Sequence, residues 1–258
     1  MRFRRLFSLT LAFWAVLGAA ALADTHADEA KMGRQVYSDL AGKDQIVRNS
    51  PYAAIVQNVG ARIAAAAGHQ WYRERFYIVR GNQMNAFSAP GGYVFVNEGL
   101  LRGIDNVDEL ANVLGHETAH LILGHVVARN KQAERRNMLT NIGHWFVNAT
   151  SKGSQNTYNA ATAASTYTFL GFTRQQEYDA DRTGALLAAR AGFNPWGSVW
   201  FSAEVLRVQG DSGYEQYVQQ HPSTNDRIAH LKAYFKSNPQ MFARWPSRMP
   251  SSSGLPMS

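Results

Sequence analysis

The clearest periodic pattern in the chain runs from Val107 to Arg129. Apolar residues recur there at steps of three and four, and the stretch contains no proline. These apolar positions are Leu110, Val113, Leu114, Leu121, Val126 and Val127. Asn106 precedes the stretch, with Glu109 three residues later, which is typical of a helix N-terminus. The pattern therefore predicts one amphipathic helix that covers 107–129.

Other stretches predict further helices and a small sheet. The pattern from Asp28 to Gly68 is helical, and another helical pattern follows Thr173. Short runs of aromatic and β-branched residues at 76–79 and 93–96 are separated by turn residues, so we expect a hairpin whose second strand leads to the 107–129 helix. The fold class expected is α+β and mostly helical, with a small antiparallel β-sheet beside that helix.

The 107–129 helix carries the sequence HETAH at His116 to His120. On a helix this spacing puts both imidazoles on one face, about 6 Å apart along the axis, so two ring nitrogens can reach one zinc ion. Zinc lowers the pKa of water, and the carboxylate of Glu117 can take the proton as the water attacks a carbonyl carbon. The motif indicates hydrolysis of an amide or ester. The alternative is a pair of core histidines on an amphipathic helix.

A catalytic zinc site needs a third protein ligand. His125 is near in the chain, but on one continuous helix it lies about 140° around the axis from His120, so it is expected to face elsewhere and to be structural. The helix after Thr173 places Glu177 and Asp181 four residues apart on one face. Such a pair suits one carboxylate on the metal and one that holds a ligating histidine. The alternative is an acidic first turn that complements the helix dipole.

Together, these motifs resemble those of the gluzincin metallopeptidases, in the family (family forty-eight) that includes the CAAX prenyl protease, the HtpX heat-shock protease and the Oma-type proteases. The resemblance rests on HETAH at 116–120 and EYDAD at 177–181. It extends to NAFSAPGGYVFVNEGLL at 85–101 and HPSTNDR at 221–227. It implies a zincin-like domain with one zinc ion (Zn2+) per chain.

Carried over residue by residue, the resemblance implies zinc ligands at His116, His120 and Glu177. Glu117 is then the general base, and Asp181 is an acid that supports the ligands.

The resemblance also places His221 and Arg227 near the site. Either could stabilise the oxyanion of the tetrahedral intermediate. Alternatively, His221 could occupy the open zinc position and hold the enzyme latent. A third interpretation leaves His221 in a loop, with residues 223–225 capping the next helix.

The two ends of the chain predict export and a free tail. Arg2, Arg4 and Arg5 precede an apolar run from Leu6 to Leu22, so residues 1–23 are expected to be a signal peptide cut after Ala23. A retained membrane anchor is the alternative, and both the Sec and the twin-arginine routes stay open. A zinc metallopeptidase domain is expected over 24–238 and a flexible C-terminal tail over 239–258. The chain has no cysteine, which excludes disulfides and thiolate ligands.

The net charge of the chain limits the kinds of binding partner that are expected. The formal net charge is +7, and loss of three signal-peptide arginines leaves +4. A mild positive charge allows peripheral membrane contact through acidic lipid headgroups. No basic cluster is interleaved with aromatic residues, so nucleic acid is not expected as a partner. Protein or peptide substrates are expected, and the oligomeric state is left open.

The expected function is a zinc-dependent endopeptidase that cleaves unfolded or misassembled proteins in the bacterial cell envelope, located in the periplasm. One alternative is a chaperone-like or regulatory factor with a latent zinc site. Another is a zinc amidase that acts on cell-wall substrates. The complete set of His116, Glu117, His120 and Glu177 favours an enzyme.

Overall fold

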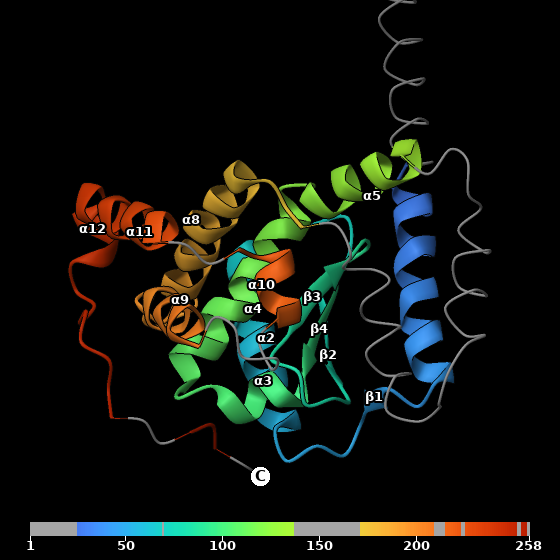
Figure 1. Cartoon of the computed structure of the whole chain (residues 1–258), viewed down its shortest axis with the longest axis horizontal. Coiled ribbons are helices and arrows are strands. Elements are labelled where there is room, and N and C mark those ends of the chain that lie inside the picture. Colours follow the sequence, from blue (N-terminus) through green and yellow to red (C-terminus); the bar gives the residue numbers. More distant parts are fainter. Residues whose placement is uncertain are drawn as a thin grey trace, which may run out of the picture.

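The computed structural model describes residues 25–68, 70–136, 171–208, 215–222, 225–251 and 254–256. The signal peptide expected over 1–23 lies outside these residues. Helices surround one small sheet (Figure 1), so the expected fold class, α+β and mostly helical, is confirmed. Within the described ranges, no helix is long and apolar enough to cross a membrane.

A helix over residues 25–42 precedes the labelled elements. In chain order these are β1 (Ile46–Val47), α2 (Ala53–Ala67), β2 (Arg75–Val79), β3 (Ala86–Ala89), β4 (Tyr93–Asn97), α3 (Glu98–Gly103), α4 (Val107–Ile122), α5 (His125–Arg136), α8 (Arg174–Arg190), α9 (Gly197–Arg207), α10 (Glu215–Gln220), α11 (Asn225–Ser237) and α12 (Pro239–Phe242).

The sheet is mixed, with the strand order β1-β2-β4-β3. The expected hairpin between 76–79 and 93–96 is wrong, because β2 and β4 are parallel neighbours with Phe76 opposite Val94. The hairpin is instead formed by β3 and β4, which pair antiparallel. Gly91 and Gly92 have φ values of 75° and 88°, so they supply the left-handed backbone that the tight turn requires. The short strand β3 has only a weak apolar pattern, which is why the sequence analysis missed it.

The two faces of the sheet pack against different helices. Phe87 and Phe95 point toward the 25–42 helix, where they contact Val36 and Leu40. Alternate residues such as Val94 belong to the main core, which α2 and α4 complete. The period of two along β4 therefore places the sheet between two layers of helix.

The expected single helix over 107–129 is wrong in one respect. Asn106 caps it as predicted, because its side chain accepts a hydrogen bond of 3.1 Å from the Glu109 amide. However, α4 ends at Ile122, and Gly124 has a φ of 70°. A glycine in the left-handed region ends a helix readily, since it carries no Cβ. A second helix, α5, begins at His125.

The helices α4 and α8 approach each other through glycines. A Cβ on Gly184 would lie 2.7 Å from the backbone nitrogen of His116, and one on Gly115 would lie 2.8 Å from the Gly184 carbonyl oxygen. Thr173 caps the start of α8 through a capping box, with Gln176 as the reciprocal partner. The two helices that carry the sequence-predicted ligands therefore meet backbone to backbone.

The described part of the tail packs against the domain more closely than its composition suggests. Phe242 is buried beside Phe235. The Trp200 indole donates a hydrogen bond of 2.9 Å to the Ser247 carbonyl, and Leu255 contacts the main core. Phe242 and Leu255, one aromatic and one aliphatic residue, anchor this part of the tail, whose other residues are mostly polar or proline.

We predict that Gly184→Ala lowers the free energy of unfolding by about 1–3 kcal/mol, because the added methyl group must push two helix backbones apart. Denaturant unfolding of the purified chain measures this change. Gly42→Ala is the matched control, since a Cβ at Gly42 meets nothing within 4 Å. Equal stability of the two variants would contradict the close helix contact.

Candidate metal centre

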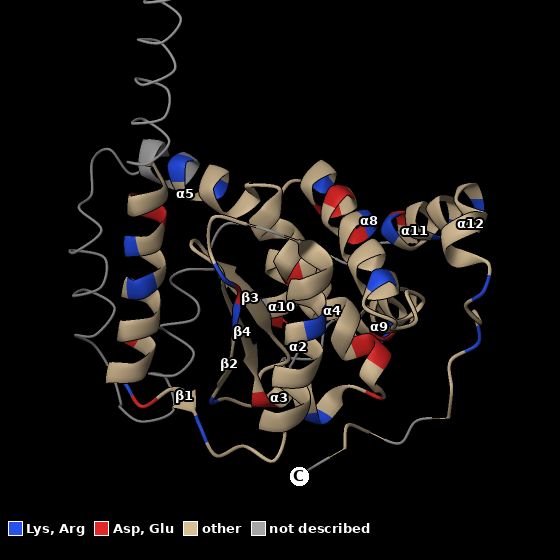
Figure 2. Cartoon of the chain, turned by 180° about the vertical axis from the view of Figure 1, so that it is seen from behind, with Lys and Arg blue, Asp and Glu red and all other residues tan. Residues whose placement is uncertain are grey.

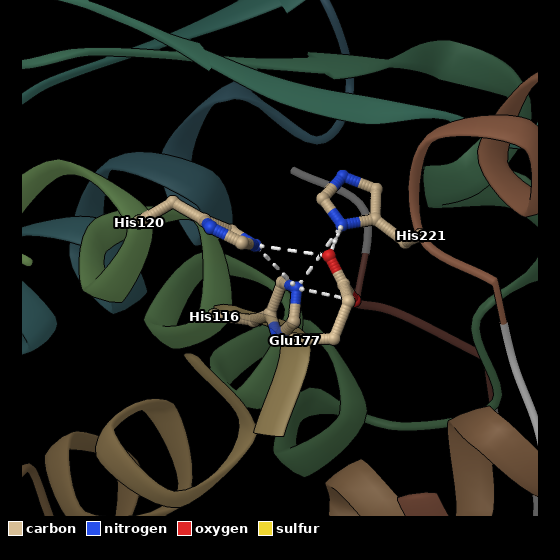
Figure 3. A group of neighbouring side chains, drawn as sticks. All are labelled: His116, His120, Glu177 and His221. Atoms are coloured by element: carbon tan, nitrogen blue, oxygen red, sulfur yellow. Dashed lines mark hydrogen bonds and ion pairs between the residues drawn. The ribbon is translucent and has the colours of Figure 1, made fainter. Parts of the chain in front are cut away.

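Four buried side chains converge at the centre of the domain. His116 and His120 come from α4, Glu177 comes from α8, and His221 directly follows α10 (Figure 3). One donor atom from each residue lies within 4.8 Å of the others. The structure thus brings together all three sequence-predicted zinc ligands, and His221 as a fourth donor.

The spacing of the donor atoms fits one metal ion. His116 Nε2 lies 3.0 Å from His120 Nε2 and 3.6 Å from Glu177 Oε2, and His120 Nε2 lies 3.4 Å from Glu177 Oε1. Ligands that share one tetrahedral zinc ion are about 3.3 Å apart, given bonds of about 2.0–2.1 Å. Two imidazoles and one carboxylate are also a donor set of catalytic zinc sites. The residues present therefore fit zinc.

The protonation states of the ligand groups also suit the binding of a metal cation. Burial lowers the pKa of His120 well below its usual value, so its ring is neutral and can offer a lone pair. Burial alone would raise the pKa of Glu177, but the positive charge of Arg227 holds this pKa well below its usual range. Glu177 is therefore an anion in a buried position.

His221 lies within the donor cluster rather than beside it. Its Nδ1 is 3.1 Å from His116 Nε2 and 3.1 Å from Glu177 Oε1. Its side chain is fully buried, and its ring stacks on Tyr217 with the ring centroids 5.1 Å apart. The imidazole has the position of a fourth ligand.

Glu117 points into the same site from α4. Ser88 in β3 donates a hydrogen bond of 3.0 Å from its hydroxyl to Glu117 Oε2, and His221 Nε2 lies 3.3 Å from Glu117 Oε1. Burial raises the pKa of Glu117 to about 7. Ser88 carried no predicted role, because its only signal in the sequence is a hydroxyl in a strand of small and apolar residues.

Asp181 and Arg227 form a charged pair beside the donors. Asp181 Oδ1 lies 3.1 Å from His116 Nδ1. The Arg227 guanidinium donates two hydrogen bonds to Asp181, of 2.8 and 2.6 Å, and its Nη1 lies 2.6 Å from Glu177 Oε2. Burial alone would raise the pKa of Asp181, but Arg227 and His116 lower it. The contacts of Arg227 thus join Glu177 and Asp181, both on α8.

His125 contradicts the expectation that it faces away from the site. Its Nδ1 lies 3.1 Å from His120 Nδ1. The expectation assumed one continuous helix, whereas the left-handed turn at Gly124 redirects the chain before His125. The glycine itself was the available signal. Phe172, which also carried no predicted role, stacks on His120 with the ring centroids 3.7 Å apart.

Comparison with known proteins gives matches along most of the chain. The model of "Peptidase family M48" matches residues 52–235. The beta-barrel assembly-enhancing protease of Escherichia coli K12 is 25% identical over 206 residues, which cover 78% of this chain and 42% of that protein. The chain thus spans less than half the length of this relative.

Two mitochondrial proteins are also similar. The mitochondrial metalloendopeptidase OMA1 of Schizosaccharomyces pombe is 26% identical over 210 residues, which cover 80% of this chain and 60% of that protein. Human metalloendopeptidase OMA1 is 27% identical over 162 residues, or 60% of this chain and 31% of that protein. The resemblance noted from the sequence motifs is confirmed by the family match, which includes every residue of the donor cluster. This chain belongs to peptidase family M48.

Proposed function

We propose that this chain is a zinc-dependent endopeptidase that cleaves unfolded or misassembled proteins in the bacterial cell envelope. The observation that carries the proposal is the convergence of two imidazoles and a carboxylate on one point, with the buried Glu117 beside them. The names of the M48 relatives, which are a protease and two metalloendopeptidases, support peptide-bond hydrolysis.

The residues of this chain have distinct parts in that reaction. Bound zinc supplies Lewis-acid polarisation of water and of the scissile carbonyl. Glu117 accepts the proton of the attacking water and passes it to the leaving amine, for which its pKa of about 7 is well matched. Ser88 holds one carboxylate oxygen of Glu117 by a hydrogen bond of 3.0 Å. Asp181 accepts a hydrogen bond from His116 Nδ1, which keeps His116 Nε2 free as a donor to the metal.

The strand β3 is suited to align a peptide substrate. It stands at one end of the strand order, with β4 as its neighbour in the described sheet. An extended peptide that adds to such an edge forms main-chain hydrogen bonds with little side-chain selectivity. Because Ser88 of β3 contacts Glu117, the added strand would lie next to the general base. Weak selectivity suits a protease that acts on unfolded chains.

His221 and Arg227 were the two candidates for oxyanion stabilisation. We propose instead that Arg227 holds the carboxylates, because its guanidinium already contacts Asp181, Glu177 and the Pro222 carbonyl. We propose that His221 occupies the fourth ligand position and keeps the enzyme latent until the segment that carries it moves. Its burial and its contact of 3.1 Å with His116 Nε2 favour latency over a role as an oxyanion donor.

The location and the partners are proposed from the sequence. The pattern of residues 1–23 supports export to the periplasm, with a metallopeptidase domain over 24–238. Figure 2 shows that the basic residues of the described part are distributed over several elements and interspersed with acidic ones. This distribution over the described residues argues against binding of nucleic acid, whereas protein substrates and peripheral membrane contact are proposed from the sequence.

We predict that Glu117→Gln lowers the rate of casein cleavage by about 10²- to 10⁴-fold, because the amide cannot take a proton from water. Zinc content should be unchanged, since Glu117 is not one of the expected ligands. Cleavage of labelled casein and elemental analysis measure the two quantities on the same sample. A variant that binds zinc and cleaves at the wild-type rate would exclude Glu117 as the base.

Replacing His221 distinguishes a role of this residue in latency from a role in catalysis. We predict that His221→Ala raises casein cleavage about tenfold, a change equivalent to about 1.4 kcal/mol, because the fourth position opens to water. Steady-state rates of the two proteins at equal zinc content provide the measurement. A fall in kcat would support the oxyanion role and contradict latency. His230→Ala is the control, since this histidine stacks on Tyr178 outside the donor cluster.

A further inference from the structure

The ring of His120 has two nitrogens with different environments. Its Nε2 faces the donor atoms of His116 and Glu177, at 3.0 and 3.4 Å. To bind a metal there, Nε2 must carry a lone pair, so the proton of the neutral ring lies on Nδ1. His120 is fully buried, and a buried N–H group without a hydrogen-bond partner is costly. The Nδ1–H group therefore needs an acceptor.

His125 supplies that acceptor. Its Nδ1 lies 3.1 Å from His120 Nδ1, within hydrogen-bond distance, and its side chain is also buried. In a neutral imidazole one nitrogen accepts while the other carries the proton.

The fold places His125 there by a specific turn. Gly124, with a φ of 70°, separates His125 from the last turn of α4, and the Ala128 amide donates a hydrogen bond of 3.0 Å to the Gly124 carbonyl at the start of α5. Val126 is 1% exposed, so the residue after His125 is anchored in the core. The position of the imidazole is therefore set by backbone that is held on both sides.

An aromatic ring holds the plane of His120 from another direction. Phe172 stacks on His120 at an interplanar angle of 15°, and the Arg129 guanidinium carbon lies 4.3 Å from the centroid of the Phe172 ring. Stacking restricts the tilt of the His120 ring but leaves its rotation within the plane open. A hydrogen bond at Nδ1 fixes that rotation.

We propose that His125 is a positioning residue for the metal site, which accepts the Nδ1–H of His120 and so fixes its tautomer and its ring orientation. The two histidines of the HETAH motif are then held in different ways. His116 has the carboxylate of Asp181 at its Nδ1, whereas His120 has a neutral imidazole. This inference rests on the metal site of the proposed function, but it does not depend on peptide cleavage.

Zinc affinity of two variants tests the proposal. His125→Leu keeps the bulk of the side chain and removes the acceptor, whereas His125→Gln offers a carbonyl oxygen. We expect His125→Leu to weaken zinc binding by about 10- to 100-fold, and His125→Gln to stay within about threefold of the wild type, in competition with a chelator of known affinity. Wild-type affinity in His125→Leu would overturn the proposal, as would an equal loss in both variants, which would indicate packing alone.

A second measurement does not depend on the folding of the variants. In the zinc-loaded wild-type chain with ¹⁵N-labelled histidine, we expect the proton of His120 on Nδ1 and that of His125 on Nε2. A proton on Nδ1 of His125 would overturn the proposal, because that nitrogen could not then accept. Neither measurement uses a substrate, so a failure to cleave casein would count against the proposed function and not against this one.

Discussion

The site depends on the close contact between α4 and α8, where Gly115 and Gly184 let the two backbones touch. The helices run in opposite directions along each other, because His116 lies beside Asp181 and His120 lies beside Glu177. Both pairs are spaced by four residues, so Glu177 reaches both imidazoles and Asp181 reaches His116. A larger residue at the crossing would move Glu177 away from the imidazoles, and the donor atoms would no longer share one point.

The contact between α4 and α8 also buries charged side chains, and neighbouring groups must compensate their charge. Glu117, Glu177 and Asp181 are all at most 6% exposed, and a buried carboxylate that lacks a partner costs several kcal/mol. Arg227 on α11 compensates two of them; burial alone would lower its own pKa, but the charges of Asp181 and Glu177 raise it. His221 and Arg227 are therefore held at the metal centre by electrostatics, and α11 is also held by the buried contact of Leu231.

Much of the site could be predicted from the sequence because its signals are local. HETAH and EYDAD each place two side chains on one helix face, and the helices that carry them begin at Val107, directly after the predicted cap Asn106, and at Arg174. One error arose where the geometry is not local, and another where the local signal of Gly124 was overlooked. The pairing of β2 with β4 depends on the unnoticed strand β3, and His125 was placed by extending a helix through Gly124. The contact of Ser88 with Glu117 joins segments 29 residues apart and has no periodic signal.

The central claim is that His116, His120, Glu177 and His221 bind one zinc ion together. X-ray absorption at the zinc edge of the purified chain, together with elemental analysis, tests this most directly. We expect one zinc ion per chain with four nitrogen and oxygen ligands at about 2.0–2.2 Å and strong imidazole scattering. A substoichiometric metal content, or a six-coordinate shell of oxygen alone, would contradict it.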